Sequence, residues 1–143
     1  MINYTELRLQ DIHPHIIRIG KKIYTSTDDF FEFCRKLKNY KYIFSEEEFE
    51  NYEPDDDEDE QYIETEPDIG AYIRYIDTRD IPIKLYKGGH IVTYSDKDIT
   101  LKKFNSYWKI QRNLCYVFQK KSNDELFIES VQKAMKTKIQ GTE

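Results

Sequence analysis

Residues 81–95 read IPIKLYKGGHIVTYS and carry the clearest local pattern in the chain. Two apolar-rich runs flank Gly88 and Gly89, and a Gly-Gly pair supplies the positive φ angles that a tight hairpin turn requires. A turn centred there would bring Leu85 opposite Val92 on one face of the paired strands. The stretch therefore predicts a β-hairpin with one buried face and one largely solvated face.

Upstream of this hairpin the sequence predicts three more strands and one helix. Alternating isoleucines indicate a strand over residues 15–24, interrupted near Gly20. Ser26 and Asp29 fit a capping box, which would begin a helix over residues 28–38. Runs rich in Tyr and Ile predict strands over residues 40–44 and 69–77.

Downstream of the hairpin the sequence predicts two helices. Ser106 would cap the first, because apolar residues recur at helical spacing from there to Phe118. The second begins at Asn123, with acidic residues in its first turn and lysines near its end, as the helix dipole favours. Its apolar residues fall in register at Ile128, Val131, Met135 and Ile139.

This order of elements predicts an α+β fold with a small antiparallel sheet, one N-terminal helix, two C-terminal helices and an acidic loop inserted between strands. Aromatic residues make up 15% of the chain, and a disordered chain would be poor in them, so most of the chain should fold. At 143 residues the length suits a single domain, residues 1–143, with an acidic insert at 45–68.

The acidic insert, SEEEFENYEPDDDEDEQYIETEPD, divides the charge of the chain into two parts. It holds 14 of the 27 acidic residues, and no Lys or Arg occurs between Lys41 and Arg74. The rest of the chain keeps 13 acidic residues against all 22 basic ones, so a −14 insert is set in a +9 body. Adjacent carboxylates repel one another and are costly to bury, so the insert must be solvated or neutralised by a basic surface.

We interpret the insert as a binding segment that imitates nucleic acid. Dense carboxylates on an extended segment resemble a phosphate backbone, and the flanking tyrosines could stack or anchor. By analogy of charge with phage anti-defence and nuclease-immunity proteins, this predicts an inhibitor or antidote whose partner is a protein with a basic, nucleic-acid-binding surface. The same run also fits a solvated loop that folds onto the basic body. The predicted contact residues are Glu46, Glu47, Glu48, Glu50, Tyr52, Glu53, Asp55, Asp56, Asp57, Glu58, Asp59, Glu60, Tyr62, Glu64 and Glu66.

An alternative interpretation makes the chain a nucleic-acid-binding subunit. Basic and aromatic residues interleave over residues 97–121, and such binding needs cations for phosphates and flat rings for bases. In that case the acidic insert would be autoinhibitory, occupying the groove until a target displaces it. The candidate residues are Lys102, Lys103, Trp108, Lys109 and Arg112.

Catalysis finds little support in the sequence, which lacks GxSxG, GxxxxGK[ST], GxGxxG and HExxH motifs. We therefore expect no enzyme activity and no cofactor. We also expect no metal, because two histidines, His13 and His15, are weak evidence for a metal site and suit surface histidines at a strand start. Cys34 and Cys115 lack CxxC spacing and are expected to be reduced and packed within helices. With no signal peptide or membrane-spanning run, a cytoplasmic location is expected, in the host if the protein is viral.

Overall fold

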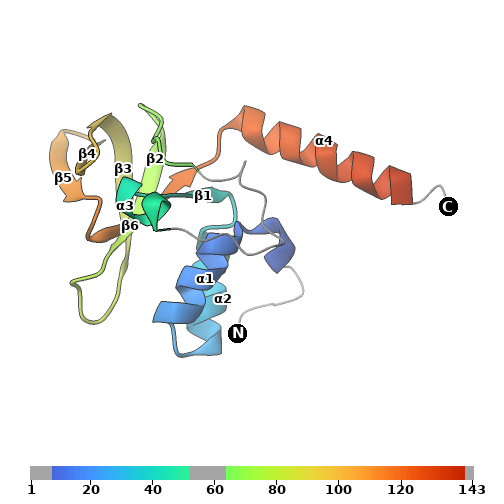
Figure 1. Ribbon diagram of the computed structural model, residues 1–143, viewed down its shortest axis with the longest axis horizontal. Coiled ribbons are helices and arrows are strands. Elements are labelled where there is room, and N and C mark those ends of the chain that lie inside the picture. The colour runs from blue at the N-terminus through green and yellow to red at the C-terminus, as the bar shows by residue number, and fades with distance from the viewer. Residues whose placement is uncertain (1–7, 52–63, 141–143) are drawn as a thin grey trace.

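The computed structural model describes residues 8–51 and 64–140, with side chains to residue 136, and confirms the α+β class. Six antiparallel strands form one sheet in the order β1-β6-β2-β3-β4-β5 (Figure 1). The strands are β1 (Tyr40–Ile43), β2 (Tyr72–Asp77), β3 (Leu85–Tyr94), β4 (Asp98–Lys103), β5 (Ser106–Gln111) and β6 (Cys115–Lys120). The described helices are the 3-10 helix η2 (Leu9–Asp11), α1 (Pro14–Ile23), α2 (Thr27–Lys36), α3 (Glu46–Glu50) and α4 (Asn123–Gln140).

Residues 15–24 form helix α1, so the strand predicted there is wrong. Pro14 occupies the first helical turn, where its missing N–H costs nothing, and the His13 side chain accepts a hydrogen bond from the His15 backbone N–H. Ile16 and Ile19 lie three residues apart and are both buried, which is a helical spacing. The β-branched isoleucines are typical of strands, but their packing against the sheet determines the structure here.

α1 and α2 cover part of one face of the sheet, where β1, β2 and β6 lie. A cluster of buried side chains joins the two helices to β1, β2 and β6 (Ile12, Ile16, Ile19, Phe33, Cys34, Leu37, Tyr42, Phe44, Ile76 and Phe118). A Cβ on Gly20 would lie 2.9 Å from ring carbons of Phe30 and Phe33, so glycine allows α1 and α2 to approach closely. The predicted Ser26 cap of α2 is confirmed, since its hydroxyl accepts from the Asp29 N–H at 3.4 Å.

The other face of the sheet buries a second cluster, to which every strand contributes (Ile43, Ile73, Tyr75, Ile91, Ile99, Leu101, Ile110, Cys115 and Val117). No described helix supplies a residue to it. Irregular pairing at Ile73/Tyr75 and at Ile91/Thr93 increases the local twist of the strands. The sheet therefore coils around its own apolar face.

Gly88 and Gly89 lie inside β3, so the predicted turn at these residues is wrong. β3 pairs instead with β2 and β4, and Gly88 has a φ of +75° at the irregularity facing Ile73. A Cβ on Gly88 would lie 1.8 Å from the Ile73 carbonyl oxygen. The two glycines thus permit a close approach between neighbouring strands, which is the other use of glycine in a sheet.

Residues 106–120 form β5 and β6, so the chain has one C-terminal helix rather than two. The apolar residues that matched a helical spacing belong to two alternating strands separated by a turn. In β5, Ile110 is buried and Trp108 is half-buried, while Tyr107 and Lys109 are exposed. The final helix is confirmed: Ser122 accepts from the Glu125 N–H, and the Glu125 carboxylate accepts from the Ser122 N–H, both at 3.1 Å.

Candidate binding surfaces

The acidic insert begins with a helix whose start is fixed by a capping box. Ser45 accepts from the Glu48 N–H at 3.2 Å, and the Glu48 carboxylate accepts from the Ser45 N–H at 3.2 Å. The Tyr42 hydroxyl also donates to Glu48 at 2.6 Å, and burial together with this carboxylate raises the pKa of Tyr42. Glu48 therefore stabilises α3, so the fold already uses the carboxylate that was predicted to contact a partner.

Most of the other described carboxylates of the insert are exposed. Glu46, Glu47, Glu50 and Glu66 are exposed, and no described Lys or Arg forms an ion pair with any of the four. Glu64 is 3.9 Å from Lys41, whose closer partner is Glu125 at 2.8 Å. The body thus leaves most of these flanking carboxylates open to an outside molecule.

The centre of the insert lies outside the described residues. This applies to nine of the predicted contact residues: Tyr52, Glu53, Asp55, Asp56, Asp57, Glu58, Asp59, Glu60 and Tyr62.

Buried Arg112 holds the two ends of the insert together. Its guanidinium donates to the carbonyl oxygens of Phe44 at 2.8 Å and Thr65 at 2.7 Å, and to that of Ser95 at 3.2 Å. Phe44 also donates its N–H to the Glu64 carbonyl at 2.8 Å. The side chain is only 4% exposed, so Arg112 supports the base of the insert and is not displayed to a ligand.

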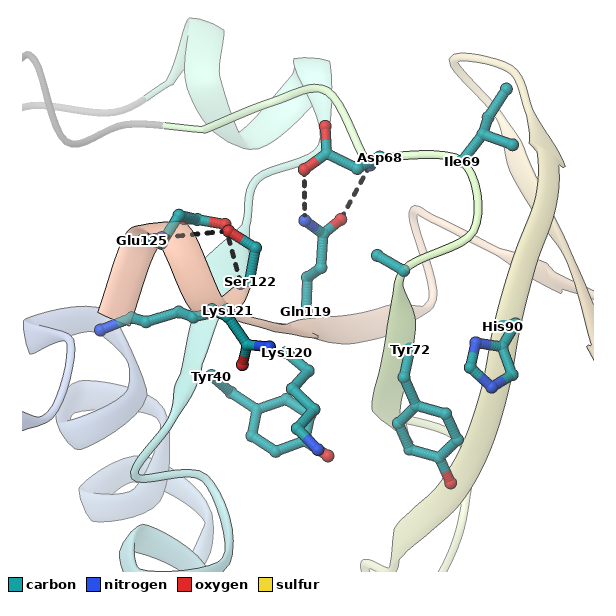
Figure 2. A pocket seen from close by; sticks show the side chains of 12 residues that line it. Tyr40, Asp68, Ile69, Tyr72, His90, Gln119, Lys120, Lys121, Ser122 and Glu125 are labelled. Carbon is teal, nitrogen blue, oxygen red and sulfur yellow. Dashed lines mark hydrogen bonds between the residues drawn. The ribbon is translucent and has the colours of Figure 1, made fainter. Parts of the chain in front are cut away.

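Beyond Thr65 the returning chain is fixed by buried Gln119 on β6. The Gln119 amide donates to the Asp68 carboxylate and accepts from the Asp68 N–H, each at 2.9 Å (Figure 2). The entry and the exit of the insert therefore lie side by side on the sheet. The sequence instead placed Arg112 among the candidate nucleic-acid-binding residues and gave no role to Gln119, because contacts between residues far apart in the chain leave no local signal.

Glu46 lies against Asp96 in the turn between β3 and β4. The hydrogen bond with Asp96, and then the repulsion between the two carboxylates, raise the pKa of Glu46. A carboxyl group whose pKa is higher in the folded state favours folding below its unfolded pKa, and that contribution is lost as pH rises through the folded pKa. At neutral pH the pair therefore opposes folding.

We accordingly expect Glu46→Gln to raise the melting temperature at neutral pH, because it removes this repulsion. The gain should disappear below the unfolded pKa of a glutamate, near pH 4.3. Thermal unfolding at a series of pH values checks this, with Glu47→Gln on the same helix as the control. A gain at pH 7 that persists unchanged in acid would contradict the assignment to Asp96.

Pairing between strands gathers cationic and aromatic side chains into one row across the sheet. Tyr40 lies opposite Lys120, Tyr72 opposite His90, His90 opposite Lys102, and Lys102 opposite Tyr107. Ile73 lies opposite Gln119, which places the preceding Tyr72 next to Lys120. We call these six residues the cross-strand row: Tyr40, Lys120, Tyr72, His90, Lys102 and Tyr107. Five spacings between strands make it about 24 Å long.

The cross-strand row is accessible and is hollowed at one end. His90, Lys102 and Lys120 are exposed, and Tyr107 is 59% exposed with the Lys102 ammonium 5.2 Å from its ring centroid. A hollow of about 610 Å³ opens beside Tyr40, Tyr72, His90 and Lys120, near the start of α4 (Figure 2).

The structure separates the residues of the predicted nucleic-acid site. Lys102 and Lys109 share the exposed face, since Lys109 pairs with Thr100 beside the row. Trp108 points to the opposite face, packs on the second cluster and donates to the Tyr75 hydroxyl at 3.1 Å. Lys103 is half-buried at the end of β4. Tyr107 and Lys120 belong to the predicted segment 97–121 but were not named as site residues. Tyr40, Tyr72 and His90 were missed, because only strand register brings them to the row.

The histidine and cysteine expectations need two corrections. His13 and His15 lie at the start of a helix, and His15 is buried against the Phe44 ring at 4.5 Å, so the expected surface histidines at a strand start are wrong. Both cysteines are buried and unbridged, but Cys115 lies in a strand. Burial raises the pKa of Cys34 to about 11 and that of Cys115 to about 12, which disfavours their reactive thiolates.

Comparison of the chain with protein-family models, with curated proteins and with solved structures finds no match. Within the described residues, no three His, Cys, Asp or Glu side chains converge as a metal site. No helix of that part of the chain has the length and apolarity needed to cross a bilayer.

Proposed function

We propose that the chain is a non-enzymatic binding protein that acts in the cytoplasm as an inhibitor or antidote. Its residues 46–66 would bind the basic surface of a nucleic-acid-handling protein. The observation that carries the proposal is the exposure of the flanking carboxylates and their lack of described ion-pair partners. Glu47, Glu50 and Glu66 are exposed and make no ion pair with the described bases, although the body is strongly basic.

The anchored base of the insert supports this function. Arg112 and Gln119 fix where the segment leaves and rejoins the sheet, so its carboxylates are presented from a defined place. Anchoring the ends lowers the entropy that is lost when the segment binds. Long-range attraction would speed association, and 50%-exposed Phe49 with Tyr52 and Tyr62 would supply desolvated contacts.

The test of this proposal is neutralisation of the acidic run. We expect replacing Asp55–Glu60 by Asn and Gln to weaken binding to the protein that the intact chain captures from its native source, by at least about tenfold at low salt. Titration calorimetry at two salt concentrations measures this, with the intact chain losing affinity as salt rises. Two single-charge variants, Glu50→Gln in the insert and Asp29→Asn on α2, test whether the negative charge must lie in the insert. Only Glu50→Gln should weaken binding. Unchanged affinity in the neutralised variant at both salt concentrations would contradict the proposal.

The cross-strand row favours a second candidate function, the binding of single-stranded nucleic acid. Alternating rings and cations offer stacking for bases and charge for phosphates, and the length suits a site of about 4 nucleotides or more. The acidic insert would then compete for the row and inhibit binding.

A gel shift with a single-stranded oligonucleotide separates the two functions. The second candidate predicts that neutralising Asp55–Glu60 strengthens the shift, and that Lys102→Ala or Tyr107→Ala weakens it. Lys97→Ala, at an exposed turn away from the row, is the control. The leading proposal predicts no appreciable shift by either the intact or the neutralised chain.

A further inference from the structure

We propose that β5 is a docking edge, to which a partner protein adds an extended acidic segment as a further strand. β5 stands at one end of the order of the six-stranded sheet, and among the described strands it pairs only with β4 (Figure 1). Helices α1, α2 and α4 lie away from it. This inference is independent of what the acidic insert binds.

Tyr107 and Lys109 direct their backbone polar groups to the outer side of β5. The β4–β5 turn has two residues, so the flanking pair, Lys103 and Ser106, exchanges hydrogen bonds, and bonded pairs then alternate along the two strands. Tyr107 and Lys109 fall in the non-bonded pairs, whose N–H and C=O groups point away from β4. No hydrogen bond to these groups is found within residues 8–51 and 64–140. Such a row of open groups is a template for another strand.

The side chains beside these open groups leave room for an added strand. Tyr107 is 59% exposed and Lys109 is exposed, both on one face of β5. Trp108 lies on the other face, half-buried where it packs on the second cluster. One face of an added strand would therefore cover Trp108, and the other would lie beside Tyr107 and Lys109. This arrangement favours a segment in which apolar residues alternate with polar ones.

The charges of the β4–β5 hairpin specify that the polar residues of the segment are acidic. Residues 99–111 hold three lysines, Lys102, Lys103 and Lys109, and no acidic residue. No described Asp or Glu forms an ion pair with any of the three. Lys109 is on β5 itself, so it would lie directly across from the added strand. There an opposite charge stabilises the pairing, and a like charge destabilises it.

The same lysine disfavours a second copy as the occupant. Pairing of β5 with β5 would bring two copies of the basic hairpin together, and a lysine on an edge strand is a common protection against such self-association. The occupant that fits both the backbone and the charge is an extended segment in which Asp or Glu alternates with apolar residues.

Peptide selection tests this docking edge. The probe is a library of peptides of about ten residues, in which Glu alternates with random residues, selected on the intact chain. We expect apolar residues at the random positions, and at least about fivefold weaker binding of the selected peptides to Lys109→Glu. Lys38→Glu is the matched control, an exposed change before β1 at the opposite edge of the sheet, and should bind as the intact chain does. Circular dichroism verifies that both variants fold. A library that yields no binder, or peptides that bind Lys109→Glu equally well, would overturn the proposal.

N-methylation distinguishes strand addition from attraction between charges alone. The N–H groups of alternate residues in a strand point to opposite sides. Methylating one alternate set of peptide nitrogens should therefore abolish binding, whereas methylating the other set should leave it intact. Equal binding of the two methylated peptides would contradict pairing at an edge.

Hydrogen exchange then locates the bound peptide on the chain. The Tyr107 and Lys109 amides should become more protected in the complex, and the Lys38 amide should not change. Unchanged exchange at Tyr107 and Lys109 would overturn the proposal. So would protection that the free chain gains as its concentration rises, which indicates a second copy at the edge, or protection that only an oligonucleotide produces.

Discussion

Gly88→Ala is expected to lower the free energy of unfolding by about 3–5 kcal/mol, through a strained backbone and an overpacked contact. Gly88 has a φ of +75°, a backbone conformation that residues with a Cβ adopt only at an energetic cost. The added Cβ would also lie 1.8 Å from the Ile73 carbonyl oxygen. That oxygen belongs to the backbone of the neighbouring strand, so relief requires β2 and β3 to separate.

Gly70→Ala is the matched control for this prediction. Gly70 also has a positive φ, +91°, but an added Cβ would meet no atom within 4 Å. It should therefore lose only the conformational part, about 1–2 kcal/mol. Urea unfolding of the two variants measures the difference. Equal losses at Gly70 and Gly88 would show that the close approach of β2 and β3 contributes nothing to stability.

Arg112→Met is expected to cost about 3–5 kcal/mol, because it leaves buried carbonyl oxygens without donors. Methionine keeps much of the volume of the side chain but removes the hydrogen bonds to Phe44, Thr65 and Ser95. Lys109→Met, an exposed change on β5 three residues before Arg112, should stay within about 0.5 kcal/mol of the native chain. Urea unfolding gives both values.

Hydrogen exchange distinguishes the role of Arg112 at the insert from a general loss of stability. The Phe44 N–H donates to Glu64 across the base of the insert, and its protection should fall more than that of buried Ile73 on β2, inside the sheet. Uniform loss of protection at both amides would contradict the assignment of Arg112 to the base of the insert.

Elements with one dominant local signal were predicted correctly from sequence. The Ser26 cap of α2, the short apolar strand β1 and the acidic first turn of α4 each depend on neighbouring residues only. Their physical causes are capping and burial over a few residues, which a sequence shows directly.

The wrong predictions concern residues whose pattern fits two structures. The isoleucines of α1 suit either a strand or a helix, and burial against the sheet decides. Gly88 and Gly89 suit either a turn or a close strand approach, and the pairing with β2 decides. The hairpin turn between β4 and β5 is at Phe104 and Asn105 instead, with Phe104 at a φ of 55°.

The candidate sites were only partly predictable for the same reason. The charge of the acidic insert is visible in the sequence, and its position between β1 and β2 was expected from it. The clamp by Arg112 and the cross-strand row depend on contacts between residues far apart in the chain. Such contacts follow from strand register, which long-range packing determines.

Competition most directly tests whether the insert replaces nucleic acid on its partner. A labelled oligonucleotide is bound to the partner protein, and the intact chain or the variant neutralised at Asp55–Glu60 is then titrated in. The account predicts that the intact chain displaces the oligonucleotide and that the neutralised variant needs at least about tenfold more protein. A stable ternary complex, or equal displacement by both proteins, would contradict it.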